Sequence, residues 1–123
     1  MKPKYSFFAN TKYALQGLAS LLKFESSFKI ELCIIIPALI FDYFLPLNLI
    51  EHLFLAGVLV LILITEALNS ALEACVDLAT NQWHEKAKIA KDCGSAAVFF
   101  AIVFALFSWS AVLLNLEFQW IKN

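Results

Sequence analysis

Residues 53–77 read LFLAGVLVLILITEALNSALEACVD, and this stretch indicates a helix that enters the membrane. Its first 13 residues carry no charge, but they are too few to cross a bilayer, because a membrane helix needs about 20 residues. The helix must therefore continue through Glu66, and we expect a span at about 52–76 that carries a carboxylate into or near the bilayer. Ionisable side chains are costly there and face a bundle interior or a watery cleft, so they are candidates for function.

The composition of the whole chain also indicates a membrane protein. Of 123 residues, 62% are hydrophobic and 15% are charged, whereas soluble domains have roughly 45–50% and about 25%. A single domain of this length has too little interior to bury so much apolar surface. The three cysteines include no CxxC pair, which argues against a zinc site or a disulfide framework.

Three further segments complete the predicted architecture. The first span is expected at about 29–47, with a turn after it at residues 46–48, and the third at about 93–116, where 24 consecutive residues are uncharged. Residues about 4–24 repeat apolar positions at spacings of three and four, which is typical of a helix lying on the membrane surface. The sequence therefore predicts one all-α integral membrane domain over residues 1–123, with three transmembrane helices and an N-terminal amphipathic surface helix.

The nine basic residues are all lysines, and their distribution predicts the orientation. Five precede or open the first span, three lie between the second and third spans, and only one follows the third. The first turn has none. Since positive residues gather on the cytoplasmic side, we expect the N-terminus and the second loop to lie inside.

The polar residues of the second span share one face. On a helix, Glu66, Asn69, Ser70, Glu73 and Asp77 fall on a single stripe. For Asn69 and Ser70, hydrogen bonding between helices is an equally good interpretation. Two carboxylates one helical repeat apart repel each other unless a proton or a cation separates them. Glu66 and Glu73 therefore indicate a general base or a site for a hard cation.

A second polar cluster follows at residues 82–95. Lys88 and Lys91 are one turn apart and could meet phosphate oxygens, although taken alone they are better explained by contact with anionic lipids and by membrane topology. Glu25 and Glu31 are expected at the membrane level of Glu73, so carboxylates and lysines converge on one interface. No known soluble phosphate-binding motif is present, so any nucleotide must be held in another way. No nucleic-acid partner is expected.

The stretch 66–77, followed by His84, Lys91-Asp92 and residues 94–98, resembles the bacterial membrane diacylglycerol kinases and their undecaprenol kinase relatives. The pattern E-x-x-N-[ST]-A-[IL]-E-x-x-x-D, then H, A-K-D and a small-residue run, is long and specific. The resemblance extends upstream to residues 14–18 and 25–31. It implies a homotrimer in the bacterial cytoplasmic (inner) membrane, with active sites shared between subunits.

The implied reaction is MgATP-dependent phosphorylation of the hydroxyl of diacylglycerol, giving phosphatidic acid at the cytoplasmic face. Residues 94–95 fit the diacylglycerol branch, while residues 66–69 and 87–90 also resemble the undecaprenol branch, so undecaprenol is the alternative lipid.

The resemblance also implies roles for individual residues. Glu66 corresponds to the general base that takes the proton of the lipid hydroxyl, and Glu25 and Glu73 correspond to the carboxylates that hold Mg²⁺ with the ATP phosphates. The implied lipid-binding residues are Glu66, Asn69 and Ser95. The implied ATP-binding residues are Tyr13, Glu25, Glu73, Gln82, His84, Lys91 and Asp92.

A small proton-coupled membrane exporter is the alternative from another functional class. Such a protein also carries a membrane carboxylate, which would account for Glu66. It would not account for Glu25, Glu73, Lys91 and Asp92 together, and it would not depend on MgATP.

Overall fold

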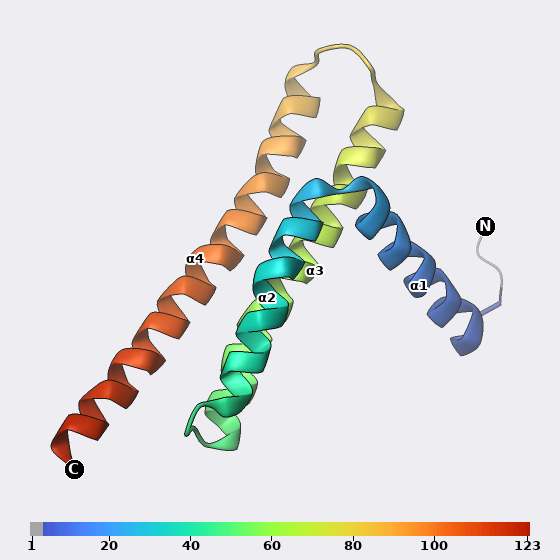
Figure 1. Ribbon diagram of the computed structural model, residues 1–123. Helices are drawn as coiled ribbons and strands as arrows, with labels where there is room; N and C mark the ends of the chain where they lie inside the picture. The colour runs from blue at the N-terminus through green and yellow to red at the C-terminus, as the bar shows by residue number, and fades with distance from the viewer. Residues whose placement is uncertain (1–3) are drawn as a thin grey trace.

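The computed structural model describes residues 4–123, and within this range the chain forms four α-helices and no strand. These are α1 (Phe7–Phe24), α2 (Ser26–Phe44), α3 (Leu49–Ala79) and α4 (Glu85–Lys122). The two long helices α3 and α4 form an antiparallel hairpin, α2 lies along α3, and α1 diverges from the bundle at its junction with α2 (Figure 1). The predicted all-α class is confirmed.

Among the described residues, α3 and α4 are the helices long and apolar enough to cross a membrane. The shorter helix α2 carries Lys29, Glu31 and Asp42, which leaves only residues 32–41 uncharged between them. That run is shorter than the roughly 20 residues of a typical span. Length and composition therefore support two membrane-crossing helices, and the third predicted span stays a prediction.

One narrow face of each of these three helices is buried. In α2 the buried residues recur every seven positions, at Phe28, Ile35 and Asp42. In α4 they recur every three or four, and most are small, which lets α4 approach α3 closely. The central cluster comprises Ile35, Val58, Leu59, Ile62, Ala101 and Ala105. Most large apolar side chains outside this core are exposed, so the remaining faces need hydrocarbon or other protein to cover them.

Local signals set the helix ends, and these differ somewhat from the predicted spans. Leu45 adopts an extended conformation before Pro46, as residues before proline prefer, so α2 ends at Phe44 rather than near 47. Helix α3 begins at Leu49 because Asn48 and Glu51 form a capping box. Helix α4 begins at Glu85, where the His84 ring accepts a hydrogen bond from the backbone N–H of Lys86 at 3.0 Å. The charge-rich segment 85–92 is therefore helical, and α4 extends beyond its predicted span on both sides.

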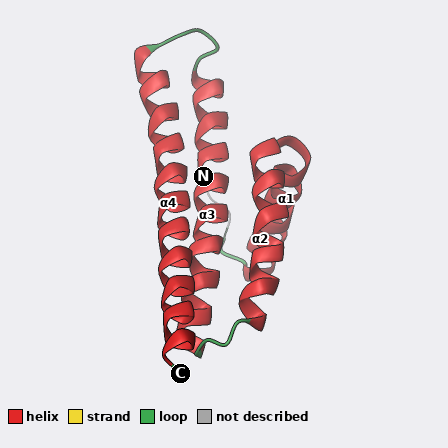
Figure 2. Ribbon diagram, turned by 60° about the vertical axis from the view of Figure 1, so that its left-hand side comes forward, coloured by secondary structure: helices red, strands yellow, loops and turns green. Residues whose placement is uncertain are grey.

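Helix α1 contributes no buried residue, and it touches the bundle mainly where it meets α2 (Figures 1 and 2). Ser6 caps its start by accepting a hydrogen bond from Ala9, and Glu25 both ends α1 and precedes α2 in an extended conformation. One extended residue is enough to turn the chain between the two helices. This junction places Glu25 beside α3.

Candidate active site

The polar stripe predicted for residues 66–77 lies on α3, where it continues the buried face of that helix. Glu66 and Ser70 follow the core residues at helical spacing and are only 6% and 9% exposed. Asn69 and Glu73 are half-buried, and Asp77 is exposed near the end of the helix. The stripe therefore runs from a buried carboxylate to one in contact with solvent.

Acidic side chains from α2 and from the α1–α2 junction meet this stripe. Glu31 brings its carboxyl group close enough to that of Glu66 for the two to interact, and Glu31 Oε2 is buried without a hydrogen-bond partner among residues 4–123. Glu25 and Glu73 both lie close enough to Glu66 to act on it electrostatically. Neighbouring carboxyl groups repel one another when ionised, so a proton or a cation near them would stabilise this arrangement.

The approach of Glu31 to Glu66 has no counterpart among the predicted roles. From the sequence, Glu31 was expected at this membrane level, but no function was assigned to it. Its position beside Glu66 depends on how α2 packs against α3. Glu31 is three residues after Phe28 and four residues before Ile35, and both of these are buried. This spacing puts Glu31 next to the buried face of α2, and it is the feature of the sequence that could have indicated a role.

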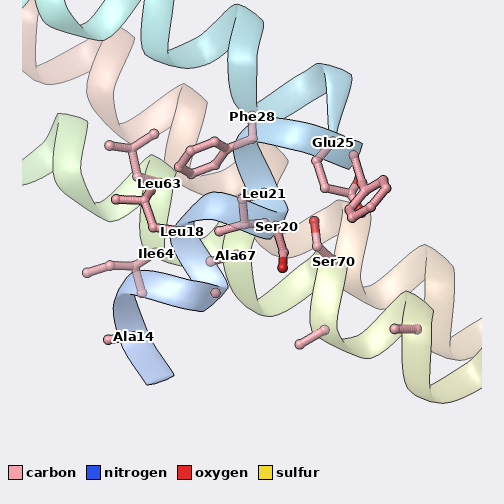
Figure 3. Close-up of a pocket in the computed structure, with 14 residues that line it drawn as sticks. Ala14, Leu18, Ser20, Leu21, Glu25, Phe28, Leu63, Ile64, Ala67 and Ser70 are labelled. Atoms are coloured by element: carbon pink, nitrogen blue, oxygen red, sulfur yellow. The ribbon is translucent and has the colours of Figure 1, made fainter. Parts of the chain in front are cut away.

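An apolar groove of about 630 Å³ lies between α1 and α3 (Figure 3). Leu63 and Ala67 of α3 form part of one wall, and the polar lining residues are Ser20, Glu25 and Ser70. Glu25 and Ser70 lie toward the same end of the groove, away from Ala14 (Figure 3). The groove therefore leads along apolar side chains to the carboxylate cluster.

A second, more polar cavity of about 460 Å³ lies where α3, α4 and the loop between them meet. Gln82, His84, Lys91 and Asp92, all predicted nucleotide contacts, line it together. The exposed indole of Trp83 also lines this cavity, although no role was predicted for it. The structure thus brings these four predicted residues to one place.

Two ion pairs cross or flank this cavity. Lys91 Nζ lies 2.7 Å from Asp77 Oδ1, which joins α4 to α3, and Lys88 Nζ lies 2.6 Å from Asp92 Oδ2 within α4. The hydrogen bond that Lys91 donates to Asp77 raises the pKa of Lys91 above its usual value, and the hydrogen bond that Lys88 donates to Asp92 does the same for Lys88. Glu73 adds to the negative field at Lys91. Lys91 therefore lines the polar cavity and also lies within the electrostatic reach of Glu73.

Among residues 4–123, five predicted site residues line neither cavity: Tyr13, Glu66, Asn69, Glu73 and Ser95. Tyr13 is exposed on α1, and Ser95 is exposed on α4. A single chain therefore does not bring every predicted residue into one site.

The sequence profile described as prokaryotic diacylglycerol kinase matches residues 12–113. The chain belongs to the prokaryotic diacylglycerol kinase family. Curated relatives named diacylglycerol kinase cover most of it. The Haemophilus influenzae protein is 39% identical over 107 residues, covering 85% of this chain and 88% of the relative. The Escherichia coli K12 protein is 36% identical over 101 residues (82% and 83%), and the Pseudomonas aeruginosa protein is 34% identical over 105 residues (85% of each).

The prokaryotic diacylglycerol kinase match includes the whole candidate site. Its range begins just before Tyr13 and extends past Ser95, so every residue predicted for catalysis, metal, nucleotide or lipid lies within it. All four helices contribute to this range. The family assignment therefore applies to the same part of the chain that holds the carboxylate cluster and both cavities.

For a kinase of this family, the donor set should suit Mg²⁺, and the oxygen-rich cluster does. Mg²⁺ is usually held by one or two carboxylates together with substrate phosphates and water, and it does not need a cage of protein ligands. Among residues 4–123, no three His, Cys, Asp or Glu side chains come together as a ready-made metal site. Glu25 and Glu73 would supply the carboxylates, since both lie close enough to Glu66 to act on it electrostatically.

Proposed function

We propose that this chain is an ATP-dependent lipid kinase that phosphorylates the hydroxyl of diacylglycerol. The observation that carries the proposal is the position of the carboxylate cluster. Glu25, a member of the cluster, lines the apolar groove. Glu73, another member, acts electrostatically on Lys91, which lines the polar cavity. A kinase acting on a lipid needs this arrangement, because one substrate is apolar and the other is a highly charged nucleotide. The family assignment supports the same reaction.

The apolar groove suits the acyl chains of the lipid. Its Leu and Ala side chains offer no hydrogen bonds, while Ser70 and Glu25 at one end can contact a polar headgroup. A lipid lying in it would present its hydroxyl toward Glu66, with Asn69 close by on the same stripe. We propose Glu66, Asn69 and Ser95 as the residues that bind this substrate.

The polar cavity suits ATP. Lys91 would exchange its contact with Asp77 for a phosphate oxygen, since both are anionic partners for the same ammonium group. Gln82, His84 and Asp92 would hold the rest of the nucleotide, and the exposed Trp83 ring offers a face on which a base can stack. Tyr13 is proposed as a further nucleotide contact.

Glu25 and Glu73 are proposed to hold Mg²⁺ with the ATP phosphates. Mg²⁺ would neutralise the charge that develops on the phosphate oxygens during transfer. Glu66 would take the proton of the lipid hydroxyl. The hydroxyl oxygen would then bond to the γ-phosphorus of ATP, and the bond from that phosphorus to ADP would break. Glu66 is suited to this task because it is buried at the lipid end of the stripe.

We further propose that three spans and a surface helix assemble as a homotrimer in the bacterial inner membrane, with the N-terminus inside. The ionisable residues of α2 lie near its two ends, and the Asp42 side chain has a polar partner in His52, whose Nδ1 lies 2.9 Å from Asp42 Oδ1. Helix α2 can therefore cross the membrane despite its charges. Extensive exposed apolar faces on the helices suit burial against other copies as well as lipid. The exposed Tyr13 and Ser95 would complete a site shared between subunits.

The experiment compares Glu66→Gln with Glu73→Gln and Glu25→Gln in the purified full-length protein. Glu66→Gln keeps the shape of the side chain but removes the proton acceptor, so kcat is expected to fall about 10²–10⁴-fold while MgATP affinity changes little. Glu73→Gln and Glu25→Gln are expected to weaken MgATP binding severely and to leave the oligomer intact. Phosphate transfer from labelled ATP is measured with diacylglycerol and undecaprenol in parallel.

Two results would contradict these roles. Near-parental turnover by Glu66→Gln would show that no base acts at this position, and loss of ATP affinity as severe as in Glu73→Gln would make Glu66 a metal ligand instead. Faster phosphorylation of undecaprenol than of diacylglycerol would overturn the proposed substrate.

A further inference from the structure

Among the described residues, Gly94 is the one glycine at which a neighbouring side chain occupies the space that a Cβ atom would take. A Cβ atom at Gly94 would overlap Asn69 Oδ1 of α3, and it would also lie 3.2 Å from Asn69 Cγ and 3.1 Å from Leu72 Cδ2. By contrast, a Cβ at Gly17 or Gly57 would meet nothing within 4 Å in the part of the chain that the structure describes. Gly94 is also buried where α4 faces α3.

The Asn69 side chain is oriented by its two neighbours. Its Nδ2 donates a hydrogen bond to Glu73 Oε1 at 3.4 Å, while its Oδ1 is buried and has no hydrogen-bond partner within residues 4–123. In this hydrogen bond the Glu73 oxygen is the acceptor, so the amide turns its N–H group toward Glu73 and its oxygen toward α4. Because Gly94 lacks a Cβ, α4 leaves room for that oxygen.

We propose that Gly94 is a positioning residue for the carboxylate of Glu73. The absent side chain lets the Asn69 amide point at Glu73, and the amide in turn holds that carboxylate in one orientation. A methyl group at position 94 would turn the amide away, because the overlap falls on the far end of a side chain that can rotate. The inference rests on the proposed role of Glu73 as a ligand of Mg²⁺. Groups that orient metal ligands typically contribute about 10–100-fold to metal affinity or activity.

A role in packing alone makes a different prediction. Small residues on α4 allow close approach of α3, and at a site that only packs, Gly94→Ala would lower stability without changing metal binding. If Gly94 positions Glu73, Gly94→Ala should instead reduce metal binding in protein that is still folded and assembled. The two are separated by measuring metal binding directly.

The test uses the purified full-length protein, a non-hydrolysable ATP analogue and Mn²⁺, which prefers the same oxygen ligands as Mg²⁺ and is detected by electron paramagnetic resonance. Gly94→Ala is expected to weaken Mn²⁺ binding about tenfold in protein that remains folded and assembled. Gly57→Ala is the matched control, since it adds the same methyl group to a membrane helix with open space around it, and parental Mn²⁺ binding is expected.

Variants of Asn69 complete the test. Asn69→Ala removes both the overlapping oxygen and the donor to Glu73, so it should weaken Mn²⁺ binding as much as Gly94→Ala does. In the double variant, adding Gly94→Ala should cause no further loss, because nothing is left to displace. Parental Mn²⁺ binding by Asn69→Ala, or fully additive losses in the double variant, would overturn the proposal, and Asn69→Ala decides this even if Gly94→Ala alone fails to assemble.

Glu73→Gln separates this inference from the proposed function. If Glu73→Gln weakens Mn²⁺ binding but Gly94→Ala does not, Gly94 plays no positioning part and the metal role of Glu73 stands. If Glu73→Gln binds Mn²⁺ like the parent, Glu73 is not a ligand, and both the proposed metal role and the inference built on it fail.

Discussion

Replacing His52 with alanine is expected to destabilise the fold more than replacing its partner Asp42, although both changes remove the same contact. His52 Nδ1 lies 2.9 Å from Asp42 Oδ1, and this contact joins the end of α2 to the start of α3. The Asp42 side chain is only 7% exposed, whereas that of His52 is 26% exposed. Water can therefore replace a lost partner for the histidine far more readily than for the carboxylate.

The magnitudes follow from this difference in burial. Loss of His52 leaves a buried carboxylate without a partner, which costs about 3–5 kcal/mol in a fully buried pair. Because this pair is partly open to solvent, we expect about 2–3 kcal/mol. Loss of Asp42 leaves a histidine that can turn toward water, so about 1 kcal/mol is expected. In the His52→Ala background, Asp42→Ala should raise stability, because it removes the unpaired carboxylate.

The assay is equilibrium unfolding of the purified protein in mixed micelles for both single variants and the double variant. A coupling free energy of about 2 kcal/mol is expected. The matched control is the pair formed by Lys88 and Asp92, whose side chains are 62% and 64% exposed, and no measurable coupling is expected there. Equal costs for the two single variants, or additive costs in the double variant, would refute the reasoning. Kinase activity at low temperature should survive in the His52 and Asp42 variants, since His52 lies about 21 Å along α3 from Glu66.

Two further predictions concern orientation and the nucleotide. In a background without Cys33, Cys75 and Cys93, Asn48→Cys should react with an impermeant thiol reagent added outside intact cells and Gln82→Cys should not; the opposite pattern would place the site on the wrong side for ATP. Lys91→Met should raise the KM for ATP about 10–100-fold, whereas Lys88→Met should have little effect because Lys88 pairs within its own helix. An unchanged KM in Lys91→Met would show that this lysine does not meet phosphate.

The sequence was sufficient for the fold class and for the family. Apolar runs predict helices regardless of their neighbours, because backbone hydrogen bonds must be satisfied locally in lipid. The spacing of Glu66, Asn69, Ser70 and Glu73 determines that they share a face, since the helical repeat is the same everywhere. The match of residues 66–98 to a family motif then indicated the reaction, and the family assignment confirmed it.

Only the tertiary structure decided which of these groups meet across helices. The approach of Glu31 to Glu66, the contact of Lys91 with Asp77 and the fit of Asn69 against Gly94 all join residues on different helices. These contacts depend on the rotation and separation of packed helices, to which side chains along their whole length contribute. A local pattern determines the direction in which a side chain leaves its own helix, but the partner that it reaches is set by the packing of the neighbouring helix.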